Sequence, residues 1–244
     1  MKTVTQSWIR TGSIFLLFFV SPFPSWGSST ELIILFDLTG SCSSIIEENK
    51  KEVEYILNAL PGETCTMIIA VTEKSFSDPL KILNRDCIPA SQYTFDTRPF
   101  EVKRRMVNEW KKNSQSLGAN RPSTDLLGAI CLAGLYFSQS RKNGEGRILI
   151  LFSDMRHNTD GIDLSGVAKI PQDVLSKVRG QGLIARLKGV KVWALGVHTN
   201  GKSQHYFEGL QGFWTQYFQE SGASLETFSP DSKWSPGNKL KIPE

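Results

Sequence analysis

Short apolar runs alternate with longer amphipathic runs along most of this chain. Residues 31–36 (ELIILF) and 147–153 (RILILFS) are continuous and rich in branched side chains, as strands covered on both faces are. Amphipathic segments long enough for helices separate such runs. Because strand–helix–strand units build parallel pairs, the alternation predicts an α/β fold. We expect a doubly wound, mostly parallel central sheet with one antiparallel edge hairpin and helices on both faces.

The spacing of apolar residues defines the expected helices. Between residues 41 and 60, apolar side chains recur three and four positions apart, and Pro61-Gly62 ends the segment. An aromatic stripe at helical spacing between 204 and 220 indicates packing against the sheet, not a platform for stacking bases. The expected helices are 41–60, 99–117, 125–140, 174–187 and 204–220, and the expected strands are 31–36, 64–72, 80–83, 147–153, 190–197 and 224–228.

The second and third expected strands are joined by a turn too short for a helical crossover, so they should pair antiparallel. Cys65 then opens one arm of the hairpin and Cys87 closes the other. Because this places the two residues opposite each other, we predict a Cys65–Cys87 disulfide. Cys42 and Cys131 either pair with each other or remain buried thiols.

The amino-terminal residues are typical of a secretory signal peptide. Lys2 and Arg10 precede a short apolar run at 14–20 (IFLLFFV), followed by prolines and small residues. The run is far shorter than the roughly 20 residues that a membrane span needs. An uncleaved amino-terminal anchor is the alternative. We expect a signal peptide at 1–27, one globular domain at 28–230 and a loose carboxyl-terminal tail at 231–244.

The charge of the chain does not demand a nucleic-acid partner. The 28 basic and 24 acidic residues give a net charge of +4, and Lys2 and Arg10 supply half of that excess. A nearly neutral domain needs neither nucleic acid nor an anionic membrane as its partner. No segment after the signal peptide is apolar and long enough to cross a membrane. We therefore expect an exported protein that is periplasmic or secreted.

Hydroxyl and carboxylate side chains cluster at the ends of buried elements. Asp37, Thr39 and Ser41 follow the first strand, Thr124 begins a helix, and Asp154 follows the strand that ends at 153. The carboxyl ends of parallel strands form one rim, where ligands bind. These hard oxygen donors suit Mg²⁺, with Mn²⁺ or Ca²⁺ as alternatives, better than Zn²⁺.

This pattern resembles the metal-ion-dependent adhesion site of von Willebrand factor type A domains. The resemblance covers about residues 31–230 and includes the order of the elements. It implies that Thr39 and Ser41 bind the metal directly, that Asp37 and Asp154 bind directly or through water, and that Thr124 changes its role with ligand state. It also implies a protein partner that presents Asp or Glu to the ion.

Two positions depart from the pattern of that family. Thr39 stands where serine is more frequent, and it keeps the hydroxyl. Met155 stands after Asp154 where glycine is common, and we expect it to narrow access beside the metal.

Other interpretations remain open. Asp37 and the hydroxyls after it are also typical of a helix cap. A haloacid dehalogenase-type phosphatase has a second Asp where this chain has Thr39. A metal-dependent hydrolase would need a base, for which His157 and the nearby Asp160 are available. These two side chains are also weak candidates for partner contacts, although a solvated histidine and a turn aspartate are the simpler interpretations. A structural subunit with an empty site is the last alternative; we expect no enzyme.

Overall fold

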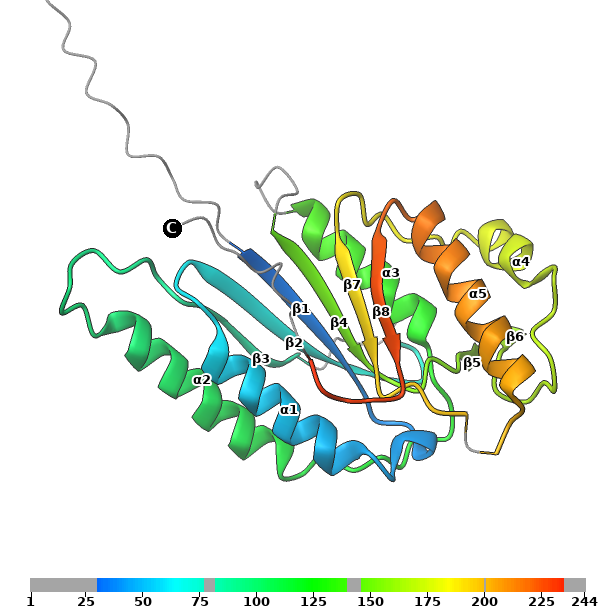
Figure 1. The fold of residues 1–244 in the computed structure, drawn as a ribbon, viewed down its shortest axis with the longest axis horizontal. Helices are drawn as coiled ribbons and strands as arrows, with labels where there is room; N and C mark the ends of the chain where they lie inside the picture. Colours follow the sequence, from blue (N-terminus) through cyan, green and yellow to red (C-terminus); the bar gives the residue numbers. More distant parts are fainter. Residues whose placement is uncertain (1–29, 77–81, 140–145, 200, 235–244) are drawn as a thin grey trace, which may run out of the picture.

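The central sheet of this protein has six strands in the order β3-β2-β1-β4-β7-β8 (Figure 1). The computed structural model describes residues 30–76, 82–139, 146–199 and 201–234. Only the edge strand β3 runs antiparallel to its neighbour, and all other pairs in this sheet are parallel. The doubly wound α/β fold is thus confirmed. The strands are β1 (Thr30–Asp37), β2 (Thr64–Val71), β3 (Ile82–Cys87), β4 (Arg147–Phe152), β7 (Lys191–Leu195) and β8 (Ser224–Ser229).

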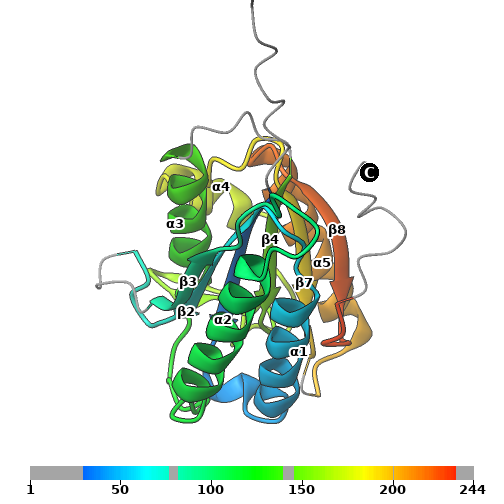
Figure 2. The ribbon, with the colours of Figure 1, turned by 90° about the vertical axis from the view of Figure 1, so that its left-hand side faces the viewer.

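Helices cover both faces of the sheet (Figures 1 and 2). Alternate residues of β1 separate the core into two halves, because side chains of a strand point to opposite faces. Leu32 and Ile34 pack with α1 and α2, whereas Ile33 and Leu35 pack with α3, α4 and α5. This double coverage explains why the central strands are continuous apolar runs. The helices are α1 (Ile46–Ala59), α2 (Arg98–Ser114), α3 (Leu126–Gln139), α4 (Val174–Gly180) and α5 (Gln204–Glu220).

Two helices are shorter than expected. Helix α1 begins at Ile46 instead of 41, because the chain first makes the short 3₁₀ turn η1 (Gly40–Cys42). Helix α4 ends at Gly180 instead of continuing to 187, and Gly182 adopts a φ of +72° that closes the turn after it. In contrast, α5 has the expected bounds, and the hydroxyl of its N-cap residue Ser203 accepts a hydrogen bond from the Tyr206 amide.

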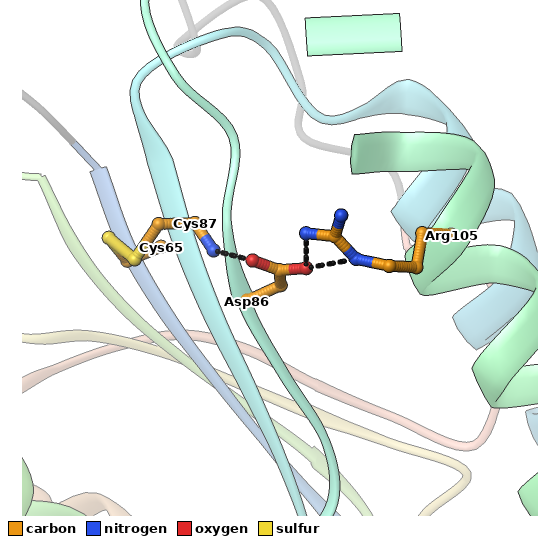
Figure 3. The surroundings of a disulfide bond; sticks show 4 residues. All are labelled: Cys65, Asp86, Cys87 and Arg105. Carbon is orange, nitrogen blue, oxygen red and sulfur yellow. Dashed lines mark hydrogen bonds and ion pairs between the residues drawn. A yellow bond between two sulfur atoms is a disulfide. The ribbon is translucent and has the colours of Figure 1, made fainter. Parts of the chain in front are cut away.

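The β2–β3 hairpin contains the predicted disulfide. Cys65 lies directly opposite Cys87 in the antiparallel register, and their sulfur atoms are bonded. Strand β3 runs from Ile82 to Cys87 instead of 80–83; the first two residues of the expected strand lie outside the described residues. Next to the disulfide, Asp86 accepts hydrogen bonds from the Arg105 guanidinium of α2, which ties the edge strand to the helix layer (Figure 3).

The two remaining cysteines are free thiols in this structure. Cys42 is buried in η1, and Cys131 is partly buried in α3. The two cysteines do not pair with each other. The alternative expectation, that they are buried thiols, is confirmed for Cys42 and in part for Cys131.

The start of the carboxyl-terminal tail is not loose, in contrast to our expectation. The Trp234 side chain is 7% exposed and meets the Trp193 ring of β7 edge to face. Its backbone amide donates a hydrogen bond of 2.8 Å to the Glu52 carboxylate of α1. At Trp234 the expectation of a loose tail is wrong, and the sequence could not show this because a single tryptophan carries no periodic signal. The expected signal peptide and residues 235–244 lie outside the described residues.

A small two-stranded sheet was not expected. Strands β5 (Asn158–Thr159) and β6 (Ile162–Asp163) pair around the turn Asp160-Gly161, in which both residues have positive φ. Strands of two residues are too short to leave a pattern in the sequence. Among the described residues, no helix combines the length and hydropathy that a membrane span requires.

Candidate metal centre

Asp37 and Asp154 lie at the carboxyl ends of neighbouring parallel strands. Strands β1 and β4 pair up to Phe36 opposite Phe152, so the two aspartates follow at the same edge of the sheet. Asp37 is 1% exposed and Asp154 is fully buried. The sheet topology therefore brings together the two carboxylates that the sequence analysis singled out.

The Asp37 carboxylate is held by groups from both strands. Its Oδ1 accepts a hydrogen bond of 2.9 Å from the Thr39 amide, and its Oδ2 accepts one of 2.6 Å from the Ser153 hydroxyl. Burial, and then the negative charge of Asp154, raise the pKa of Asp37 to about 6. These hydrogen bonds therefore do not fully compensate the charge, and a cation beside Asp37 would stabilise the ionised form.

Two hydroxyls and a thiol follow Asp37 in η1. The Thr39 Oγ1 and Ser41 Oγ atoms lie 3.1 Å apart. Cys42 is fully buried, and its sulfur lies within 4.8 Å of one carboxylate oxygen from each of the two aspartates. Burial is the main cause that raises the pKa of the Cys42 thiol well above its usual value. Cys42 was not among the predicted site residues, although its position next to Ser41 was a usable signal.

Asp154 is bound by an arginine that the sequence analysis missed. The Arg156 Nε and Nη2 atoms each lie 2.7 Å from Asp154 Oδ2. The Arg156 backbone amide donates a hydrogen bond of 3.1 Å to Asp154 Oδ1. Arg156 is 8% exposed, so this is a buried ion pair at the carboxyl end of β4.

Thr124 lies in a loop that packs beside the start of the site. Within this loop, Arg121 exchanges backbone hydrogen bonds with Leu38 and Gly40, of 3.2 and 3.0 Å. Thr124 itself is buried, and its amide donates to the Asn158 side chain. The structure thus fixes Thr124 through its backbone.

Met155 adopts a φ of +63°, in the left-handed region that favours glycine. Its side chain is fully buried in the core with α3 and α5, so it does not form the rim that we expected to narrow access. The conformation is held by the Ser153 hydroxyl, which accepts from the Met155 amide, and by the Trp214 indole, which donates to the Met155 carbonyl. The strained backbone turns Arg156 back toward Asp154.

His157 is a buried histidine and not the solvated one that we expected. Its Nδ1 accepts from the Leu127 amide, and its Nε2 lies 3.1 Å from the Thr159 carbonyl oxygen. Burial lowers the pKa of His157 to about 4, so the neutral imidazole prevails at pH 7. Because the side chain is fully buried, it offers no surface to a partner in this conformation. Asp160, in contrast, is exposed at the tip of the β5–β6 turn.

The oxygen donors present fit a hard divalent cation. The carboxylate of Asp37 and the hydroxyls of Thr39 and Ser41 are of the kind that Mg²⁺, Mn²⁺ and Ca²⁺ prefer. Asp37 and Asp154 carry two negative charges, and Arg156 balances only one of them. One negative charge remains uncompensated, and it would attract a cation. The Asp154 carboxylate, however, is already paired with Arg156.

The topology, with its antiparallel edge strand beside a parallel sheet, is that of a von Willebrand factor type A-like α/β domain. The pilus adhesin SpaC from Lactobacillus rhamnosus GG, in its open conformation, aligns with a TM-score of 0.51 at 10% identity. The alignment covers 84% of this chain and 28% of that chain, so this chain spans well under a third of the adhesin. At such low identity the likeness shows the fold alone.

Two further solved structures are similar. A von Willebrand factor type A protein from Catenulispora acidiphila has a TM-score of 0.43 at 13% identity, and the alignment covers 80% of this chain and 43% of that one. An aerotolerance-related membrane protein from Bacteroides fragilis NCTC 9343 has a TM-score of 0.42 at 16% identity, covering 84% and 94%. The sequence matches no protein-family model and no curated protein.

Proposed function

We propose that this protein is an exported binding module that holds one divalent cation at the carboxyl ends of β1 and β4. Asp37, Thr39 and Ser41 supply the first oxygen ligands, and Asp154 and Thr124 complete the site directly or through water. Mg²⁺ is the expected ion, with Mn²⁺ or Ca²⁺ as alternatives. The observation that carries the proposal is the buried, incompletely compensated Asp37 carboxylate beside two hydroxyls.

The proposed partner is a protein that presents an Asp or Glu side chain. A bound divalent cation supplies a positive centre with exchangeable positions, to which such a carboxylate binds. The residues of this chain hold the ion at the rim of the sheet, where ligands of open α/β sheets bind. The similar SpaC protein is described as a pilus adhesin, which supports a binding role without naming a partner.

His157 is not a suitable general base for the alternative function, a metal-dependent hydrolase. Both ring nitrogens are engaged with backbone groups, and burial holds the pKa near 4. A general base must reach the proton that it removes, and this imidazole is enclosed. Of the two candidate bases this leaves only the exposed Asp160, so we propose binding and not hydrolysis.

A peptide-display experiment tests the proposed partner chemistry. The full chain is immobilised and screened with a random peptide library in Mg²⁺, beside Asp37→Asn and the exposed-surface control Asp173→Asn. We expect retained peptides to require an Asp or Glu, and to be lost in EDTA and on Asp37→Asn but kept on Asp173→Asn. Retention that persists in EDTA, or that needs no acidic residue, would contradict the proposal.

Export has its own test. The Cys65–Cys87 disulfide supports an oxidising compartment, because such bonds are rare in the cytosol of most organisms. We expect protein recovered from a periplasm or culture medium to begin near residue 28 when it is sequenced from its amino terminus. A chain that still begins at Met1 would count against the signal peptide and favour an uncleaved anchor.

A further inference from the structure

The Oδ2 atom of Asp154 is engaged by the Arg156 guanidinium. This Oδ2 accepts a hydrogen bond of 2.7 Å from the Nε atom of the guanidinium, and the Nη2 atom lies 2.7 Å from the same oxygen as an ion pair. Two nitrogen atoms of the guanidinium therefore lie against this one carboxylate oxygen. Oδ1 accepts the Arg156 amide as well. A metal ion that bound Oδ2 would therefore have to displace the guanidinium.

The backbone places Arg156 in this position before any ligand arrives. The φ of +63° at Met155 folds the chain back, and hydrogen bonds from Met155 to Ser153 and from Trp214 to Met155 fix the turn. The pair is also enclosed, since Asp154 is fully buried and Arg156 nearly so. A buried ion pair is weakly screened, so the guanidinium competes strongly with other cations.

The charges of the site lead to the same conclusion. Two aspartates and one arginine sum to −1, which is not enough negative charge to neutralise a divalent ion. With such an ion added, the sum becomes +1. Removing the arginine charge would give a neutral loaded site. The arginine therefore opposes the metal directly, by lying against Asp154 Oδ2, and indirectly, through like charge.

We propose that Arg156 is an internal counter-cation that competes with the divalent ion for Asp154 and thereby sets the metal affinity of the site. The inference rests on the proposed metal site and deepens it. In the metal-free protein the guanidinium neutralises Asp154. When the ion enters, Arg156 leaves Oδ2. The loaded site then carries one excess positive charge, which favours an acidic group on the partner.

Calorimetric titration with Mg²⁺ and with Mn²⁺ tests this inference on the full chain. We compare the parent with Arg156→Gln, which removes the charge, and Arg156→Lys, which keeps a charge but loses the two-pronged contact. Arg179→Gln is the matched control, because Arg179 pairs with Glu220 on the surface. We expect Arg156→Gln to bind the ions about tenfold more tightly or better, Arg156→Lys to lie between, and Arg179→Gln to match the parent.

The melting temperature gives a second measurement, which also shows whether the variant is folded. Arg156→Gln leaves Asp154 buried without its counter-ion, so its melting temperature in EDTA should fall and saturating Mg²⁺ should restore it by more than it stabilises the parent. If Arg156→Gln does not fold in EDTA, the Arg156→Lys titration carries the test: an affinity no higher than that of the parent overturns the inference.

The outcomes separate the inference from the proposed function. Metal binding in the parent with equal or weaker binding by folded Arg156→Gln would overturn the role of Arg156 and leave the metal site standing. Binding by neither the parent nor any Arg156 variant would overturn the metal site and the inference with it.

Discussion

Asp37 and His157 are both buried, but they respond to burial in opposite ways. Burial raises the pKa of Asp37 to about 6 and lowers the pKa of His157 to about 4, because in each case the charged form is disfavoured. Asp37 has an ionised neighbour in Asp154 and lies at the rim, where a cation can compensate its charge. His157 is enclosed by backbone groups and stays neutral. The two residues thus have different roles, one in the proposed site and one in the scaffold.

His157 makes the folded protein sensitive to acid. Its folded pKa lies below the unfolded value of about 6.5, so the unfolded chain takes up a proton first as the pH falls. The stability contributed by the neutral imidazole is present above pH 6.5 and is lost as the pH falls toward 4. We expect this loss to be on the order of 3 kcal/mol. Urea unfolding in EDTA between pH 7 and pH 4 measures it.

The variant His157→Gln isolates this contribution. Asp37 acts with the opposite sign in the same range, since its raised pKa stabilises the folded state as the pH falls from 6 toward 4. The difference between parent and His157→Gln removes that common effect. We expect the free energy of unfolding to fall less in the variant. Equal pH dependence in the two proteins would show that His157 does not titrate as its burial indicates.

At the scale of elements, the edge hairpin depends on its disulfide. Cys65 and Cys87 join β2 to the antiparallel edge strand across 22 residues of sequence. A cross-link of this length stabilises mainly by restricting the unfolded chain. We expect Cys65→Ser with Cys87→Ser to lower the free energy of unfolding by about 3 kcal/mol, measured by urea titration. Cys131→Ser is the control for loss of a thiol, and a similar loss there would contradict a specific role of the disulfide.

The segment after β8 also contributes to the stability of the fold. Trp234 packs on Trp193, and its amide binds Glu52 of α1, so it fastens the end of the chain to the helix that follows η1. Loss of a buried tryptophan typically costs about 3 kcal/mol or more. We expect Trp234→Ala to lower the free energy of unfolding by about that amount. A change below about 0.5 kcal/mol would show that the tail is loose, as the sequence suggested.

At the scale of the whole molecule, the sheet was predictable because both of its faces are covered. Full coverage forces continuous apolar runs such as LIILF at 32–36, and these are visible without a structure. The Cys65–Cys87 pair followed from the same strand register. Four of the five polar residues predicted for the site follow strand ends, and the structure brings these four together: Asp37, Thr39, Ser41 and Asp154. Thr124 was predicted from its place before a helix. The metal itself remains a prediction.

Other features left no readable pattern. The 3₁₀ turn before α1 continues the amphipathic spacing of the helix, so its boundary is hidden. Arg156 reaches Asp154 through a left-handed turn at Met155, and no periodicity reports such a turn. The Trp234 amide binds the carboxylate of Glu52, which lies 182 positions earlier in the chain. Long-range contacts of single side chains require the folded structure.

The central claim is that the rim beside Asp37 binds a divalent cation. Calorimetric titration of the chelator-treated full chain with Mg²⁺ and Mn²⁺ tests it most directly, beside Asp37→Asn and the control Asp173→Asn. We expect one saturable site per chain in the parent and in Asp173→Asn, and affinity at least about tenfold weaker in Asp37→Asn. No saturable binding in the parent at millimolar ion, or equal binding by Asp37→Asn, would contradict it.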